Sequence, residues 1–190
     1  MKKIIAIFLL AALWGMASLC AAAKPKYLPA SDSYIQNVGN VQVRSVVSPA
    51  YISEFLGAVI DIRQGEKVIG YNQAGDSAHL WDEPAIVYFE GGTVWLDDPS
   101  GETDMDTEAP VIQAIFTKRD VFTARGIHIG DNASLIYKKY GQPRSTKQNK
   151  NKSYRGIVDV WRRYDTESGA KLLFGIRDGR VTAISVSIKP

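Results

Sequence analysis

The fold is decided by residues 126–143, which read Gly126-Ile127-His128-Ile129-Gly130-Asp131-Asn132-Ala133-Ser134-Leu135-Ile136-Tyr137-Lys138-Lys139-Tyr140-Gly141-Gln142-Pro143. In the first part Ile127 and Ile129 alternate with a polar residue, which predicts a half-buried extended segment. Further on, apolar side chains recur every three or four residues and form one core-facing stripe on a short helix over 132–140. The stripe consists of Ala133, Ile136, Tyr137 and Tyr140.

Both ends of this helix carry boundary signals. Asp131 or Asn132 is a candidate N-cap, because a short side-chain oxygen accepts a hydrogen bond from a free backbone N–H. At the other end Gly141 suits the left-handed position after a helix, and Pro143 prevents continuation. A helix this short gains most of its stability from packing, so we expect it to dock onto a sheet.

Strand patterns surround this segment. A second short helix is predicted from Ser48-Pro49, where proline suits the first helical position, to Gly57. The turns Gln64-Gly65-Glu66, Gly91-Gly92 and Asp178-Gly179 indicate hairpins. We therefore predict an α+β fold, with an antiparallel sheet or sheets and short helices packed on one face. The predicted strands are 41–47, 58–63, 67–71, 85–90, 93–97, 111–117, 121–124, 157–164, 171–177 and 180–188.

Two segments lack any periodic pattern. Residues 24–40 contain two prolines and are predicted to be a flexible leader. Residues 144–155 are polar and basic and are predicted to be a mobile loop. The basic side chains of this loop suit an acidic partner or acidic lipid headgroups, or serve solubility alone. They are Arg144, Lys147, Lys150, Lys152 and Arg155.

The start of the chain has the pattern of a signal peptide, residues 1–23. Lys2 and Lys3 precede an apolar run over 4–13, and Ala21-Ala22-Ala23 supplies the small residues that signal peptidase needs. We expect an exported protein, periplasmic or secreted after cleavage near Ala23. Lipidation at Cys20 and a retained anchor are the alternatives.

Composition narrows the function classes. The one cysteine, Cys20, lies in the signal peptide, so the mature chain is expected to contain no disulfide and no cysteine metal site. Removing Lys2 and Lys3 from the 23 basic residues leaves 21 against 20 acidic residues. That balance argues against nucleic acid as a partner. No stretch of the mature chain is long and apolar enough for a transmembrane span.

The order of predicted elements suggests an internal duplication. A strand, a short helix, a glycine, a strand and a hairpin occur once before residue 106 and again after it. We predict two similar α+β units, 41–106 and 107–190. The alternative is a single meandering sheet with two unrelated helices.

The central motif also resembles a known family. Gly130, Ile136, Gly141 and Pro143 have the spacing found in the small outer-membrane assembly lipoproteins of the SmpA/OmlA (BamE) type and in related β-lactamase-inhibitor-protein-like domains, with Gly126 and Asp131 beside them. The resemblance covers residues 121–190, with a fainter echo in 41–96. It implies short helices packed on a small antiparallel sheet, a two-unit arrangement as in the inhibitor proteins, and a function in binding other proteins.

Candidate binding residues are aromatic, because Trp and Tyr contribute most to interfaces when they are exposed together. We select Trp81, Trp95, Trp161 and Tyr164, for which a core position is the alternative, and His128, for which a solvent-facing strand position is the alternative. His79 with its neighbouring carboxylates suits a metal or an acid–base pair, and the acidic loop over 97–108 suits weak calcium binding. The acidic loop does not match the spacing of an EF-hand, and two histidines without cysteine give little support for a metal site. We therefore predict no metal, no cofactor and no catalytic residue.

Three hypotheses on function follow. The first is a non-catalytic protein-binding module of the cell envelope or the secreted fraction. The second is recognition of a small molecule or glycan in an aromatic-lined groove between the two units. The third is a hydrolase that uses His79 or His128 with nearby carboxylates, although no nucleophile elbow or phosphate-binding loop is present.

Overall fold

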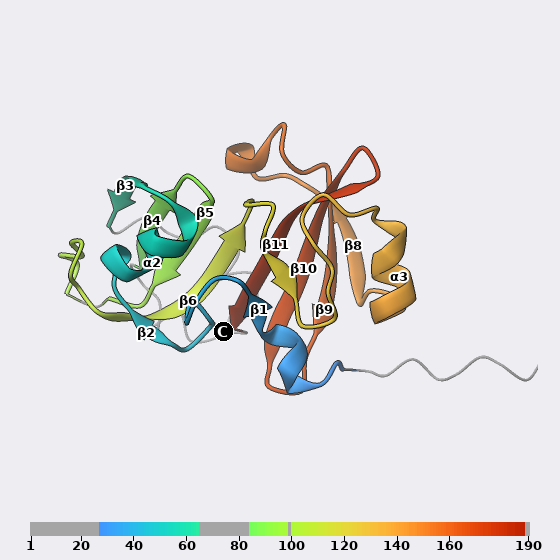
Figure 1. Ribbon diagram of the computed structural model, residues 1–190, viewed down its shortest axis with the longest axis horizontal. Helices are drawn as coiled ribbons and strands as arrows, with labels where there is room; N and C mark the ends of the chain where they lie inside the picture. Colours follow the sequence, from blue (N-terminus) through green and yellow to red (C-terminus); the bar gives the residue numbers. More distant parts are fainter. Residues whose placement is uncertain (1–26, 65–83, 99, 189–190) are drawn as a thin grey trace, which may run out of the picture.

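The computed structural model describes residues 27–64, 84–98 and 100–188 (Figure 1). Their strands form one large antiparallel sheet in the spatial order β3-β4-β5-β6-β11-β10-β9-β8; β2 also pairs with β6, and β1 pairs with β7 in a separate small sheet. The bounds are β1 Ile35–Gln36, β2 Val46–Val47, β3 Val59–Arg63, β4 Ala85–Phe89, β5 Gly92–Leu96, β6 Ala109–Phe116, β7 Phe122–Thr123, β8 Ser145–Gln148, β9 Val160–Asp165, β10 Ala170–Arg177 and β11 Arg180–Ile188. The α+β class with an antiparallel sheet is confirmed.

The hairpins set the register of the sheet. Asp178 and Gly179 both have positive φ, 51° and 71°, as the predicted turn between β10 and β11 requires. Between β4 and β5 the turn is Glu90-Gly91, one residue earlier than predicted, because Gly92 already pairs with Phe89. A Cβ on Gly92 would lie 2.3 Å from the carbonyl oxygen of Ile115, so only glycine allows β6 to approach this closely.

Two short helices are present among the described residues, as predicted. Helix α2 spans Pro49–Leu56, and the Ser48 hydroxyl accepts a hydrogen bond from the Tyr51 N–H at its start. Helix α3 spans Ser134–Tyr140 and begins two residues later than expected. Neither predicted cap is its N-cap: Asp131 accepts from the His128 N–H (2.8 Å), and Asn132 accepts from the Ser134 N–H (2.9 Å).

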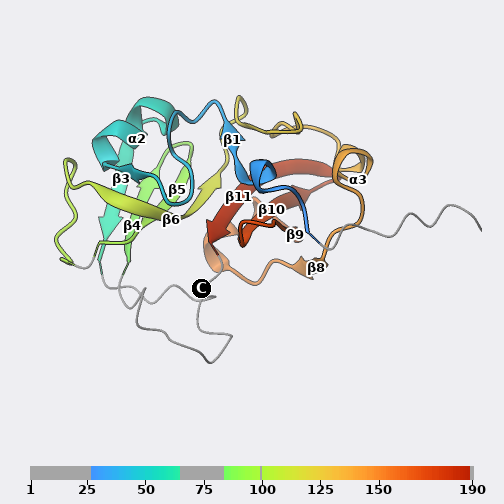
Figure 2. The ribbon, with the colours of Figure 1, turned by 90° about the horizontal axis from the view of Figure 1, so that it is seen from below.

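Both helices pack into the same core. Ile52 and Leu56 of α2 belong to one buried cluster with Ile136 and Tyr140 of α3, and with sheet residues such as Phe174. Turned by 90°, the ribbon shows α2 and the N-terminal segment on one side of the sheet (Figure 2). The helix stripe predicted from residues 133–140 faces the sheet, except that Tyr137 is 39% exposed.

The prediction of a flexible leader is wrong for residues 27–40. Leu28, Ile35 and Val38 are buried, and this segment contains the 3-10 helix η1 over Ala30–Ser33 as well as β1. The Leu28 N–H donates to the carbonyl oxygen of Asp165 (2.8 Å), which fastens the segment to the end of β9. The apolar residues that hold this segment in the core are irregularly spaced, so a search for helix or strand periodicity does not detect them.

The prediction of a mobile loop over 144–155 is also wrong. Ser145–Gln148 form β8 beside β9, and Lys152–Tyr154 form the 3-10 helix η4. Tyr154 is 7% exposed and holds η4 against the sheet. An edge strand pairs with a neighbour on one side only and tolerates polar side chains. The polar composition of β8 therefore gave no sign that this segment is a strand.

Three predicted extended segments are shorter in the structure. In 41–47 only Val46–Val47 form a strand, because Arg44 has a φ of 74° that interrupts extended backbone. In 121–124 only Phe122–Thr123 pair. Ile127 and Ile129 are buried as predicted, but their segment makes a single bridge, between His128 and Phe122. The strand predicted at 67–71 lies outside the described residues.

An ion pair between the buried Asp32 carboxylate and the partly exposed Arg125 side chain joins the N-terminal segment to the end of α3. Arg125 donates from Nε to Asp32 Oδ1 (2.8 Å) and from Nη2 to Asp32 Oδ2 (2.6 Å), and the Asp32 side chain is 5% exposed. Arg125 Nη1 also donates to the carbonyl oxygen of Lys139 (2.6 Å), and the guanidinium lies over the Tyr140 ring. These contacts hold η1 at the carboxyl end of α3.

We expect Asp32→Ala to lower the free energy of unfolding by about 1–2 kcal/mol, because the buried bidentate hydrogen bonds to Arg125 are lost. Asp61→Ala removes the partner of Arg63 in an exposed ion pair and is expected to cost less than about 1 kcal/mol. Urea denaturation of both variants checks the difference, and equal losses would contradict a structural role for the Asp32 pair.

Candidate functional site

The predicted binding residues do not converge on one site. Trp95 on β5 and Trp161 on β9 lie on the same side of the sheet, in or against one cluster. Tyr164 lies on the helix-covered side, and His128 lies in the segment before α3. Trp81 and His79 lie outside the described residues. Only the Trp95–Trp161 side therefore remains as a shared surface.

This side, called here the second face, is defined by two rows of residues that cross the sheet in register. One row is Ile86, Trp95, Gln113, Ser187, Lys171 and Asp165. The other is Tyr88, Thr93, Ile115, Ser185, Leu173 and Arg163. Trp95 and Ser185 are buried, at 7% and 3% exposure, whereas Leu173 and Arg163 are half-buried. The second face thus becomes more polar and more accessible toward β9.

Trp161 is held in place by the β8–β9 connection. Its ring meets the Tyr154 ring edge-on, with 6.2 Å between centroids, and its Nε1 donates to Asn149 Oδ1 (3.3 Å). Beneath it, a Cβ on Gly175 would lie 2.6 Å from Val158 and 3.1 Å from the Trp161 ring, so glycine is required there. Burial raises the pKa of Tyr154 to about 12. The indole is half-buried and fixed in orientation.

Tyr164 has a structural role. It is 3% exposed and its ring packs against Tyr140 and Phe174. Its hydroxyl donates to the carbonyl oxygen of Gly141 (2.9 Å), immediately after α3. Burial raises its pKa to about 12. The side chain fastens α3 to the sheet and is not at the surface.

Among the described residues, the titratable candidates are His128 with its neighbour Asp131 and the carboxylates of the acidic loop. The His128 side chain is half exposed, its ring stacks on Phe122, and its Nδ1 lies 3.8 Å from Asp131 Oδ2. The same carboxylate oxygen accepts a hydrogen bond from the backbone N–H of His128. In the acidic loop, burial opposes ionisation of Asp98, but hydrogen bonds from Thr103 and Ser100 lower its pKa overall. Within the described residues no three His, Cys, Asp or Glu side chains are grouped as metal ligands.

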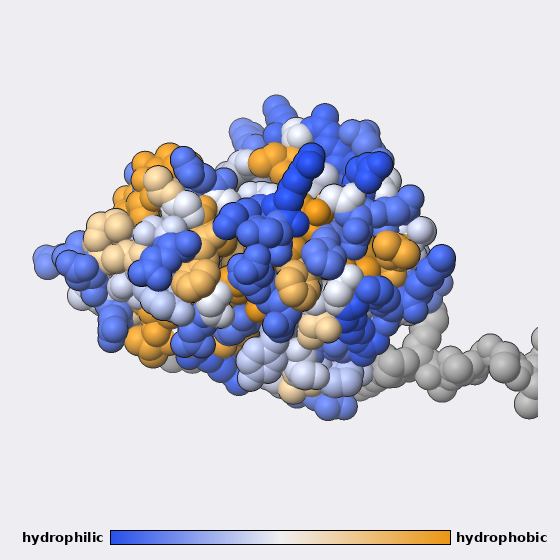
Figure 3. Space-filling model, viewed as in Figure 1, coloured by the Kyte–Doolittle hydropathy of each residue, from blue (hydrophilic) through white to orange (hydrophobic). Residues whose placement is uncertain are grey.

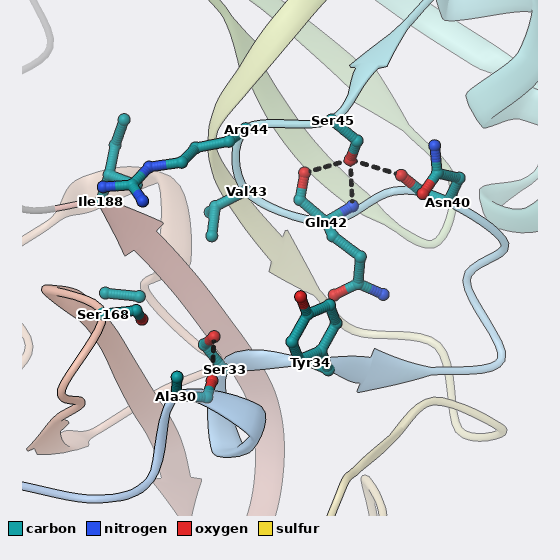
Figure 4. Close-up of a pocket in the computed structure, with 11 residues that line it drawn as sticks. Ala30, Ser33, Tyr34, Asn40, Gln42, Val43, Arg44, Ser45, Ser168 and Ile188 are labelled. Atoms are coloured by element: carbon teal, nitrogen blue, oxygen red, sulfur yellow. Dashed lines mark hydrogen bonds between the residues drawn. The ribbon is translucent and has the colours of Figure 1, made fainter.

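A pocket of about 310 Å³ lies between the N-terminal segment and the ends of β10 and β11 (Figure 4). Most of its polar atoms already bond to the protein. The Ser45 hydroxyl contacts the Gln42 N–H and the Asn40 carbonyl, and the Gln42 amide bonds to both backbone groups of Ile35. Arg44 extends across the rim toward Ile188 (Figure 4). These bonds stabilise the loop that replaces the predicted strand.

The surface around α2 and the N-terminal segment has no dominant chemical character. Hydrophobic residues are interspersed with hydrophilic ones on this face (Figure 3). A more basic surface surrounds β8: Arg144 precedes the strand, Lys147 lies in it, and Lys150, Lys152 and Arg155 line a recess of about 550 Å³ that follows it. Its lining residues are Gln148, Asn149, Lys150, Asn151, Lys152, Arg155, Gly156, Val158 and Asp159. The sequence analysis identified these basic residues, but it did not predict strand β8, which positions them.

The geometry thus defines, in the described part of the chain, an α+β protein with one large antiparallel sheet, a separate two-stranded sheet, two α-helices on one side of the large sheet, and a basic edge at β8. No protein-family model matches the chain, and a search of curated proteins finds no match. Among solved structures, the chain is similar to a DUF4309 family protein (YjgB) from Bacillus subtilis, with a TM-score of 0.41 and 11% identity over 81% of this chain and 86% of that chain. Similarity this weak gives no basis for assigning a family, a ligand or a partner.

Proposed function

We propose that this chain is a non-catalytic, exported module that binds another protein of the envelope or the secreted fraction through the second face of its sheet. One observation carries the proposal: α2 and α3 cover one side of the sheet, while the second face combines a fixed indole, Trp161, with the half-buried Leu173 and Arg163. Aromatic, aliphatic and arginine side chains of this kind anchor protein interfaces.

We include in this proposal a duplication of two units, with the boundary moved from the predicted position at 106/107 to the end of β6. The units then run from α2 to β6 and from α3 to β11, and they join where β6 pairs with β11. In its support, each helix ends at a glycine with similar backbone angles, Gly57 (φ 84°, ψ −173°) and Gly141 (φ 72°, ψ −150°), and leads to an edge strand, β3 or β8. The segment before each helix also forms a backbone hydrogen bond to the last strand of its unit. The Arg44 N–H donates to the carbonyl oxygen of Val111 on β6 (2.7 Å), and the Gly130 N–H donates to the carbonyl oxygen of Val181 on β11 (2.7 Å).

The strand order supports an alignment of the halves that differs from the one drawn from hairpins. The edge strands β3 and β8 occupy equivalent places, so the Glu90-Gly91 turn corresponds to the β9–β10 turn and not to Asp178-Gly179. This two-unit order is also the feature of the resemblance to the inhibitor-protein-like domains that matters most here, because within the described residues both α-helices then lie on the other side of the sheet from the second face.

Export is part of the proposal, with residues 1–23 as the signal peptide and cleavage near Ala23. Within the described residues no helix is long and apolar enough to cross a membrane. Mass determination of the mature chain from the culture medium and the envelope fraction checks the cleavage site, and a lipid-modified Cys20 would favour the lipoprotein alternative.

The test of binding is a comparison of variants in affinity capture from envelope extract at near-physiological salt. We expect a saturable partner protein to be lost, by about tenfold or more in affinity, with Trp161→Ala and with Leu173→Ser. Tyr137→Ala, which removes a ring from α3 on the other side, is expected to retain it. Circular dichroism establishes that each variant is folded. Equal binding by all three folded variants, or no saturable partner, would refute the proposal.

A further inference from the structure

We propose that β8 and the basic residues around it receive an extended acidic segment of a partner protein, which adds to the sheet as a further strand. This inference rests on the proposed protein-binding function and assigns it a second contact, at the sheet edge and not on the second face. It names the chemistry of the partner, an extended chain rich in Asp and Glu.

The edge of the sheet at β8 is available for pairing. Within the described residues, β8 has one neighbouring strand, β9, and the backbone of Ser145–Gln148 pairs with that strand alone. Three of its four residues are exposed, and Ser145 is intermediate. An edge strand of this kind presents backbone N–H and C=O groups that a partner strand can bond.

Charge selects the partner. Arg144, Lys147, Lys150, Lys152 and Arg155 lie within twelve consecutive residues that contain no acidic side chain. Asp159 and Asp165 are the nearby carboxylates. Asp165 is paired with Arg163 at 2.6 Å and lies 3.8 Å from Arg144 Nε, so the lysines and Arg155 carry most of the unpaired positive charge of this edge. The mature sequence contains 21 basic and 20 acidic side chains, so without these five cations the rest of it has 16 basic against 20 acidic side chains. This edge therefore carries a local positive excess that attracts an acidic strand.

The cations are carried by an ordered backbone. Asn149 donates to the carbonyl oxygens of Asn151 (3.2 Å) and Val158 (3.0 Å), and Asn151 accepts from the Ser153 N–H at the start of η4. Tyr154 then anchors η4 in the core. An ordered basic edge binds with a smaller entropy cost than a mobile loop, because less conformational freedom is lost.

The opposite edge of the sheet lacks this character. On β3 the charges of Asp61 and Arg63 neutralise each other in an ion pair of 2.7 Å. Lys147 on β8 also disfavours pairing of two β8 edges, since like charges would face each other, whereas an acidic strand brings the complementary charge. Side-chain chemistry therefore blocks self-association at β8 while admitting an acidic partner.

The probe for the test is a synthetic peptide that alternates glutamate with valine, titrated into the mature chain at near-physiological salt and followed by fluorescence anisotropy. We expect saturable binding that weakens by about tenfold or more when alternate peptide nitrogens are methylated, because strand addition needs those N–H groups. The double variant Lys147→Glu/Lys150→Glu is expected to lose binding to a similar extent. Arg119→Glu, a charge reversal in the β6–β7 connection, is expected to retain it.

Each other outcome overturns the inference. Equal affinity for the methylated peptide would mean binding by charge alone. Stronger binding to phosphatidylglycerol vesicles than to the peptide would identify a membrane surface as the occupant. No binding would leave Lys147 with the sole role of preventing edge-to-edge association. The proposed function fails separately, if Trp161→Ala and Leu173→Ser leave capture of the partner unchanged.

Discussion

Replacing Phe174 by alanine is expected to lower the free energy of unfolding by about 3–5 kcal/mol. The Phe174 side chain is fully buried on β10, and its ring packs against Tyr140 of α3 at 5.2 Å and Tyr164 of β9 at 5.9 Å. Truncation removes the contact surface of both rings and leaves a cavity under α3. Urea denaturation of the mature chain measures the loss, and an unchanged m-value would show that both states keep their compactness.

Leu173→Ala is the matched control, because it alters the neighbouring residue of the same strand. Leu173 points to the second face and is half-buried, so we expect a loss of about 1 kcal/mol. The difference tests which face of β10 contains the main core. If both variants lost the same free energy, the assignment of the two faces would be wrong, and so would the second face as a binding surface.

The strands that build the core could be predicted because the pattern of apolar side chains along them indicates which residues are buried. In β10 and β11, apolar residues continue to Ile188, and the Asp178-Gly179 turn fixes which residues pair. The glycine after α3 is equally direct evidence, since Gly141 adopts a φ of 72°. In each of these places one local property, hydrophobicity or backbone freedom, determined the structure.

Other features depend on partners that are distant in sequence. Asp32 and Arg125 form an ion pair across 93 residues, and neither belongs to a motif. Strand β8 is held by backbone pairing with β9, which leaves no hydrophobic pattern to recognise. For the candidate site, the sequence identified the basic residues and Trp161, but the strand edge and the orientation of the indole required the tertiary structure.

We expect the stability of the protein to fall as pH rises from about 10 to about 12, in part because of Tyr154. Burial raises the pKa of its phenol from 10.0 to about 12, so in this window the unfolded chain ionises while the folded chain does not. The unfolded state is then favoured, and the loss attributable to Tyr154 reaches about 3 kcal/mol at most when the pH passes the folded-state pKa. Below pH 10 both states are protonated and the contribution is fully present.

Tyr154→Phe isolates this effect, because every other titrating group, including Tyr164, is common to both proteins. The free energy of unfolding of the variant is expected to decline less steeply than that of the unchanged chain between pH 10 and pH 12. Parallel curves would mean that Tyr154 titrates near its ordinary value and that η4 is not anchored in the core. In that event the basic residues after β8 would be mobile, and the ordered edge on which strand addition depends would not exist.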